Sequence, residues 1–179
     1  MTDARPSAIT VARLPTPIGT ALLATDEAGV LRAFNWTDYE PQMRAWLARR
    51  YPATPLAEGP VLAVMRQAFE AYFAGEIGAL QAVAWRAAGT AFQLGVWQAL
   101  CDIPAGETLS YAQLADRIGR PTAMRAVGLA NGANPVALVV PCHRVIGATG
   151  ALTGYGGGLH RKRWLLAHEG ASFKDQLAA

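Results

Sequence analysis

The sequence predicts an α+β fold in two domains, the first with a small antiparallel sheet and the second made mostly of helices. Short apolar strands alternate with turn signals in the first forty residues, and two segments with apolar residues at helical spacing follow. Near residue 88 the pattern changes to short helices that begin at Thr or Ser capping residues. We therefore expect an N-terminal α/β domain at 1–88, a C-terminal domain at 89–172 and a tail at 173–179.

Length and composition are those of a globular protein. The 179 residues are 52% hydrophobic and 16% charged, which excludes wholesale disorder. A net charge of +3 and a pI near 9.1 permit binding to nucleic acid without indicating it. No apolar run approaches the eighteen or so residues of a membrane span, and because residues 1–7 are polar we expect no signal peptide. We expect a cytoplasmic protein.

Strands at 9–14, 20–24 and 30–36 are expected in the first domain, separated by turn signals at 15–19 and 26–29. Helices are expected at 41–51 and 60–75, the first with a proline at its start. The apolar face of the second helix should cover the sheet. The apolar run at 80–85 predicts one more strand.

Three helices are expected early in the second domain. Thr90 and Ser110 cap the first two, and Thr122 caps a third in which Ala123, Ala126, Val127 and Ala130 face inward while Arg125 and Asn131 are exposed. The last two helices, joined by a turn that contains Gly119, suggest a helix-turn-helix; a tightly packed helical hairpin is the alternative.

The end of the chain begins with an Asn134-Pro135 break and an apolar run at 136–140, which predicts a buried strand. A glycine-rich stretch at 147–158 follows, then a last helix at 159–169. Residues beyond Gly170 are expected to form a loose tail.

Chemistry is expected at Cys142, because His143 lies directly beside it. A nearby imidazole raises the population of thiolate, which is the nucleophilic form of cysteine, and Glu169 is a candidate to orient that imidazole. The only other cysteine is Cys101, so neither a disulfide framework nor a four-cysteine zinc site is possible. The alternative is that Cys142 is a buried small hydrophobe and His143 an ordinary turn residue.

Several motifs together resemble those of the O6-alkylguanine-DNA alkyltransferases, also called methylated-DNA–protein-cysteine methyltransferases. The motifs are Pro-Cys-His-Arg-Val at 141–145, Tyr-Gly-Gly-Gly-Leu at 155–159 and Leu-Leu-Ala-His-Glu-Gly at 165–170, with Gly-Glu-Thr-Leu-Ser-Tyr at 106–111 and Arg-Ala-Val-Gly at 125–128. The resemblance spans 90–170 and is to the stand-alone bacterial type. It implies a ribonuclease H-like first domain and a winged helix-turn-helix in the second.

This resemblance implies a DNA-repair methyltransferase of single turnover. It would move the alkyl group of O6-alkylguanine, and of O4-alkylthymine, from double-stranded DNA onto Cys142 and so inactivate itself irreversibly. His143 would deprotonate Cys142 through a water molecule, with Glu169 completing the relay and Asn134 steadying the site. Tyr111 would donate a hydrogen bond to the leaving base.

The resemblance also implies base flipping, in which Arg125 enters the duplex as a finger. Ala126, Gly128 and Asn131 would contact DNA with it, and the substrate pocket would comprise Tyr111, Val145, Tyr155, Gly156 and Gly157. No cofactor, metal or membrane is implied, and a monomer is expected. Residues 1–88 contain neither cysteine nor histidine, which excludes the metal site that some family members carry there.

Residues outside the implied site have simpler expected roles. Cys101 should be a core residue, and Arg161, Lys162 and Arg163 a solvated helix face that is a candidate for phosphate contact.

Two alternatives to alkyl transfer stay open. A cysteine hydrolase would use Cys142, His143 and Glu169 but turn over through a thioester, and a lesion sensor would bind alkylated DNA without repairing it.

Overall fold

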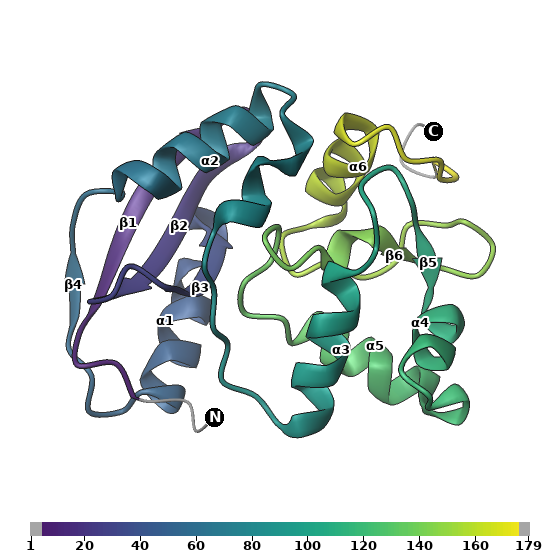
Figure 1. Ribbon diagram of the computed structural model, residues 1–179, viewed down its shortest axis with the longest axis horizontal. Coiled ribbons are helices and arrows are strands. Elements are labelled where there is room, and N and C mark those ends of the chain that lie inside the picture. The colour runs from purple at the N-terminus through teal and green to yellow at the C-terminus, as the bar shows by residue number, and fades with distance from the viewer. Residues whose placement is uncertain (1–4, 176–179) are drawn as a thin grey trace. The chain divides into compact units, whose positions relative to one another are not determined.

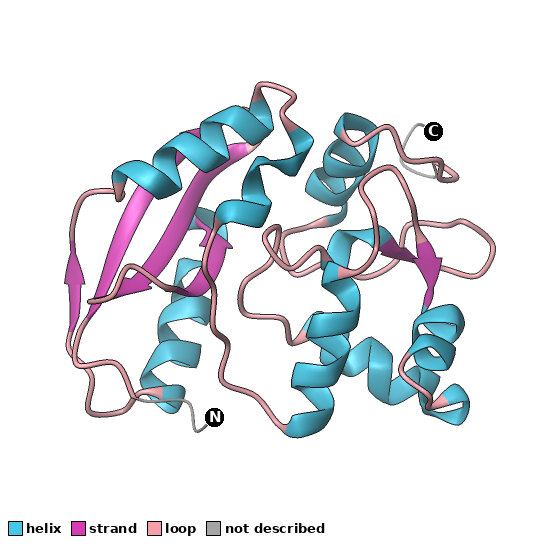
Figure 2. Ribbon diagram, in the orientation of Figure 1, coloured by secondary structure: helices cyan, strands magenta, loops and turns pink. Residues whose placement is uncertain are grey.

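The computed structural model describes residues 5–175, and the chain divides into two compact units after Ala88 (Figure 1). It is a mixed α+β fold with a small sheet and several helices, as the sequence predicts (Figure 2).

The sheet of the first unit is mixed rather than antiparallel throughout. Strands β1 (Ile9–Thr16), β2 (Gly19–Asp26) and β3 (Leu31–Trp36) form the expected antiparallel meander. A fourth strand, β4 (Leu56–Glu58), pairs parallel with β1, so that the order is β3-β2-β1-β4. Three residues are too few to show an alternating pattern, which is why β4 was not expected from the sequence.

Helices cover both faces of this sheet (Figure 1). Met43 and Leu47 of α1 (Glu40–Arg50) join a buried cluster with Ile9, Val11 and Leu22. On the other face, Phe69 of α2 (Ala63–Phe73) stacks on Phe34 with ring centroids 5.5 Å apart. The expectation that this helix covers the sheet is confirmed, and burial on both faces explains the continuous apolar run of β2.

The strand expected at 80–85 is wrong. The segment begins with a 3-10 helix, η2 (Ile77–Ala82), closed by hydrogen bonds such as Val83 N to Leu80 O at 3.1 Å. Only an isolated bridge between Leu31 and Trp85 pairs this region with the sheet. A short apolar run does not distinguish a strand from a buried turn of helix.

The second unit begins with α3 (Ala91–Cys101) and α4 (Tyr111–Arg117), which Thr90 and Ser110 cap as expected, each through a full capping box. The 3-10 turn η3 (Pro121–Ala123) then leads into α5 (Met124–Gly132). Thr122 lies within η3 and does not cap α5, so this expectation is wrong.

The apolar run at 136–140 is a tight turn and not the expected strand. Val140 N donates to Val136 O at 3.0 Å, and Leu138 has a φ of 73°. The side chains of Val136, Leu138 and Val140 are nevertheless buried, so their apolar character serves the core without a sheet. The chain continues through η4 (Cys142–Arg144) into β6 (Val145–Ile146), which pairs parallel with β5 (Leu109–Ser110).

The last helix, α6 (Leu159–His168), begins at Leu159 as expected and ends one residue earlier than expected, with Glu169 as its C-cap residue. The following residues are held more firmly than a loose tail. Ala171 is buried with Ile146 and Leu166, Phe173 packs against them, and Lys174 N donates to Gly150 O at 2.8 Å. The remainder of the expected tail, 176–179, lies outside the described residues. Within 5–175, no helix combines the length and apolar character needed to cross a bilayer.

Candidate active site

Cys142 lies at the first position of η4 and is 5% exposed. Its backbone N donates to Val140 O at 2.8 Å, which links the thiol-bearing turn to the buried 136–140 turn. The nucleophile expected from the sequence is thus held in the core of the second unit.

His143 and Glu169 meet as expected. His143 Nε2 lies 3.0 Å from Glu169 Oε1, and both side chains are fully buried. An ionised carboxylate only accepts hydrogen bonds, so Nε2 carries the hydrogen and, in the neutral ring, Nδ1 keeps its lone pair. Nδ1 has no hydrogen-bond partner among the described residues. This geometry makes Nδ1 the basic atom.

Arg144 is a site residue that was not expected from the sequence. Its Nε donates to Glu169 Oε2 at 2.8 Å, a second nitrogen donates to Oε1 at 2.9 Å, and a third to Ile103 O at 2.6 Å. Burial alone would raise the pKa of Glu169, but His143 and Arg144 outweigh it and hold that pKa below its usual range. A buried carboxylate needs such a cation, and this requirement is the signal that points to Arg144.

Burial favours the neutral form of both the thiol and the imidazole. Burial raises the pKa of the Cys142 thiol, while a hydrogen bond from Asn134 and the charge of Lys162 act in the opposite direction. Burial likewise lowers the pKa of His143 although Glu169 favours its charged form. A neutral imidazole with a free lone pair is the state that a general base requires.

Asn134 steadies the turn that leads to Cys142, as expected. Its Nδ2 donates to Val140 O at 2.8 Å and its Oδ1 accepts from Val136 N at 3.1 Å. The side chain therefore bridges both ends of the 136–140 turn.

Asn131 is buried, so its expected exposure on the DNA-facing side of the helix is wrong. It is 4% exposed, and its Nδ2 lies 3.4 Å from Cys142 O. The reason is helical period: Val127, Ala130 and Asn131 share one buried face. Ala126, in contrast, is exposed and not inward-facing.

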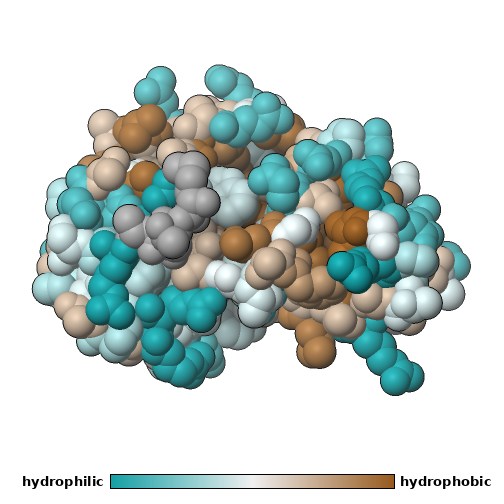
Figure 3. Space-filling model, turned by 60° about the horizontal axis from the view of Figure 1, so that its bottom comes forward, coloured by the Kyte–Doolittle hydropathy of each residue, from teal (hydrophilic) through white to brown (hydrophobic). Residues whose placement is uncertain are grey.

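Arg125 is exposed on the outer side of α5, together with two large apolar side chains. Met124 is 48% and Leu129 78% exposed. Apolar groups also reach the surface among hydrophilic ones on the face seen in Figure 3.

Tyr111 lies between α5 and the glycine-rich segment. A Cβ atom on Gly128 would lie 3.7 Å from the Tyr111 ring, and one on Gly154 would lie 3.8 Å from its hydroxyl oxygen. Of the expected pocket residues, Val145 and Gly157 are buried, Tyr155 is half-buried with its ring centroid 6.4 Å from that of His143, and Gly156 is exposed.

Arg161 and Lys162 are buried, so a solvated face is wrong for both. Arg161 donates to Gly157 O at 2.9 Å, whereas Lys162 Nζ donates to Val145 O at 2.5 Å and Thr153 O at 2.6 Å. Burial lowers the pKa of Lys162 to about 8. Arg161 and Lys162 thus hold the backbone of the glycine-rich segment through hydrogen bonds to its carbonyl groups. Arg163 is exposed and pairs with Asp175.

Cys101 is half-buried, and its Sγ donates to Trp97 O at 3.4 Å. Burial raises its pKa to about 11, which makes it a poor nucleophile at neutral pH.

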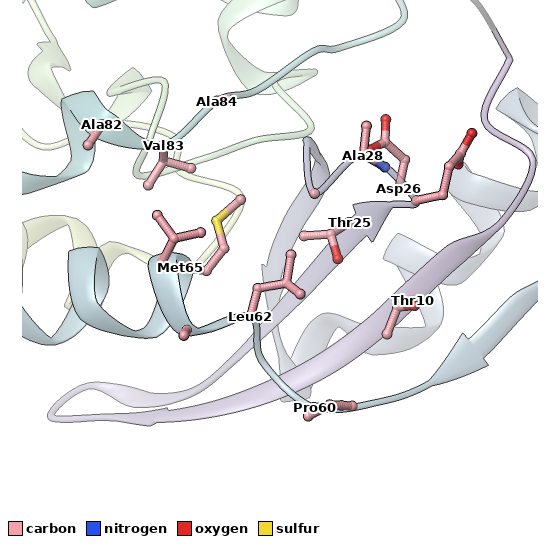
Figure 4. A pocket seen from close by; sticks show the side chains of 14 residues that line it. Thr10, Thr25, Asp26, Ala28, Pro60, Leu62, Met65, Ala82, Val83 and Ala84 are labelled. Atoms are coloured by element: carbon pink, nitrogen blue, oxygen red, sulfur yellow. Dashed lines mark hydrogen bonds between the residues drawn. The ribbon is translucent and has the colours of Figure 1, made fainter.

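A hollow of about 800 Å³ in the first unit lies between the end of β2, the start of α2 and residues 82–84 (Figure 4). Thr25, Leu62 and Met65 line it with other residues of that unit. None of the expected site residues is among them.

A buried cysteine, followed directly in the chain by a buried imidazole that contacts a carboxylate, defines a protein with a candidate thiol nucleophile and a candidate general base. A family model described as "6-O-methylguanine DNA methyltransferase, DNA binding domain" matches residues 91–171. The methylated-DNA–protein-cysteine methyltransferase of Salmonella typhimurium is 44% identical over 160 residues, covering 88% of this chain and 94% of that protein. The chain belongs to the methylated-DNA–protein-cysteine methyltransferase family.

Solved structures agree with this assignment. The crystal structure of Mycobacterium tuberculosis O6-methylguanine methyltransferase is 43% identical, with a TM-score of 0.76 over 90% of this chain and 93% of that one. A structure of the Mycobacterium tuberculosis protein in complex with DNA has the same identity and TM-score over 90% of this chain and 92% of that one.

Proposed function

We propose that this protein repairs double-stranded DNA by moving the alkyl group of O6-alkylguanine, and of O4-alkylthymine, onto Cys142 in a single, irreversible turnover. The observation that carries the proposal is the buried His143–Glu169 pair directly beside Cys142 in the chain, in which Nδ1 of His143 has no hydrogen-bond partner among the described residues.

The reaction requires only the thiol and the DNA. The Cys142 proton passes through a water molecule to His143 Nδ1, and the imidazolium so formed is stabilised by Glu169 at 3.0 Å. The sulfur then forms a bond to the alkyl carbon while the bond from that carbon to O6 breaks. The electron pair remains on the guanine, which recovers a proton. Since DNA supplies the group and the protein accepts it, no cofactor or metal is needed.

Tyr111 supports departure of the guanine by donating its hydroxyl hydrogen toward the base as negative charge develops. Its hydroxyl faces Gly154, at the start of the segment that carries Tyr155, Gly156 and Gly157. These residues and Val145 form the base pocket. The absence of side chains at the glycines lets the backbone come close to a flat base.

DNA is bound through α4 and α5, which form the helix-turn-helix. A stacked base hides its O6 substituent from in-line attack, so the nucleotide must leave the duplex. Exposed Arg125 fills the gap, and Ala126 and Gly128 permit close approach. The protein acts as a monomer. The β1–β4 sheet with helices on both faces supports a ribonuclease H-like first domain, and β5 and β6 beside α4 support a winged form of the second.

A cysteine hydrolase would use the same relay but would regenerate its thiol, because a thioester has a carbonyl that water attacks, whereas a thioether has none. Counting repaired guanines per chain separates the two. With an oligonucleotide duplex in excess, alkyl transfer gives one repaired guanine per chain and then stops. Continued turnover would support the hydrolase.

The Cys142→Ala variant separates repair from lesion sensing. It should bind alkylated duplex as tightly as the unchanged protein and transfer nothing. If the unchanged protein also bound without transferring, the sensor alternative would hold.

A further inference from the structure

Two amide side chains from the end of α5 hold the backbone around the acceptor cysteine. Asn134 Nδ2 donates to Val140 O at 2.8 Å, two residues before Cys142. Asn131, three residues earlier, directs its Nδ2 to Cys142 O at 3.4 Å. The sequence-based role of Asn131 in DNA contact is removed by its burial, which leaves this amide without an assigned function.

Two polar atoms beside Cys142 lack a protein partner among the described residues, namely Asn131 Oδ1 and His143 Nδ1. Both belong to side chains that are at least 96% buried. A buried polar atom without a hydrogen bond destabilises the folded protein, and buried water molecules satisfy such atoms where several polar groups converge. Asn131 Oδ1 accepts a hydrogen bond, as does Nδ1 of neutral His143, so a water molecule can donate one hydrogen to each.

We propose that Asn131 is a positioning residue for alkyl transfer: its Nδ2 holds the Cys142 carbonyl, and its Oδ1 orients the water that carries the thiol proton to His143. The inference rests on the proposed function. With its hydrogens directed to Asn131 and His143, this water presents a lone pair to the Cys142 thiol. The water passes one hydrogen to His143 Nδ1 and takes the thiol hydrogen in its place. The water molecule is therefore regenerated, and the electron pair of the S–H bond stays on the sulfur.

Other charged groups also act on the Cys142 thiol and contribute to the pH dependence of its reaction. Lys162 favours the thiolate by its charge. His143 contacts Glu169, and Glu169 contacts Arg144, so a change in the charge of one of these groups affects the other two. Replacement of Asn131 leaves all of these groups in place.

The test uses the full chain and free O6-benzylguanine base, which needs no base flipping, with the rate of Cys142 alkylation followed by peptide mass from pH 5 to 10. Asn131→Leu removes both polar atoms at similar volume. We expect it to react about tenfold more slowly at pH 7, with the midpoint of its pH profile raised by about one unit and much of the rate recovered at high pH. Gly132→Ala, whose Cβ has no atom within 4 Å, is the control and should match the unchanged protein.

Asn131→Asp is a second, isosteric variant whose carboxylate would oppose the thiolate, and its midpoint should rise further than that of Asn131→Leu. A rate loss in Asn131→Leu that is equal at every pH would mean that the amide only supports the fold. Unchanged midpoints in both variants would overturn the inference, as would unchanged rates. If the unchanged protein were not alkylated at Cys142, the proposed function itself would fail, which is a separate outcome.

Discussion

Replacing Glu169 by Gln removes the charge that stabilises the His143 imidazolium while keeping the shape of the side chain. Hydrogen bonds that involve a charged group contribute about 1.5–3 kcal/mol, and neutral ones about 1 kcal/mol. The 3.0 Å contact between His143 and Glu169 therefore loses about 1.5 kcal/mol of transition-state stabilisation in this variant. We expect alkyl transfer to slow about tenfold.

The same change also leaves Arg144 without the carboxylate that it contacts twice, which should lower the free energy of unfolding by about 3 kcal/mol. Single-turnover rates with free O6-benzylguanine and urea unfolding measure the two effects. Asp175→Asn is the matched control, because its carboxylate pairs with exposed Arg163. A Glu169→Gln rate within twofold of the control would refute the relay reasoning.

Three further outcomes are expected. Arg125→Ala should slow repair of duplex DNA severely and leave reaction with free base nearly unchanged, and equal slowing of both would exclude the finger role. Lys162→Met removes the donor to Val145 O and Thr153 O, so the melting temperature should fall. It also removes a charge that favours the thiolate, so the pKa of Cys142, measured from its alkylation rate against pH, should rise. An unchanged pKa of Cys142 would contradict this prediction. The pKa of Glu169 is held below its ordinary value, so this group contributes stability that is present above the ordinary pKa and is lost as pH falls. The free energy of unfolding, measured in urea, should therefore fall more steeply below pH 5 for the unchanged protein than for Glu169→Gln. Equal slopes of this free energy against pH would contradict the prediction.

The sequence predicts those parts of the site that depend on local pattern. Cys142 and His143 are adjacent, and capping boxes at Thr90 and Ser110 are short-range signals that the structure confirms. Asn131 lies on the buried face of α5 and not on the exposed face that the sequence analysis expects. The helical positions of buried Val127 and Ala130 assign it to the inner face.

Other features depend on contacts between distant segments and cannot be read from a local pattern. Lys162 is buried because carbonyl groups of 145 and 153 converge on its ammonium group. Arg144 reaches both Ile103 and Glu169, which are 41 and 25 residues away. The 136–140 run satisfies its backbone through Asn134 and internal bonds, so an apolar run that favoured a strand forms a turn.

The most direct test of the account is to find where the alkyl group goes. The protein is incubated with a duplex that carries one O6-methylguanine, and intact mass is followed by peptide mapping. We expect one methyl group per chain, on the peptide that contains Cys142, with Cys101 unmodified. A methyl group on Cys101, or repaired guanine without any gain in protein mass, would contradict the central claim that Cys142 accepts the alkyl group.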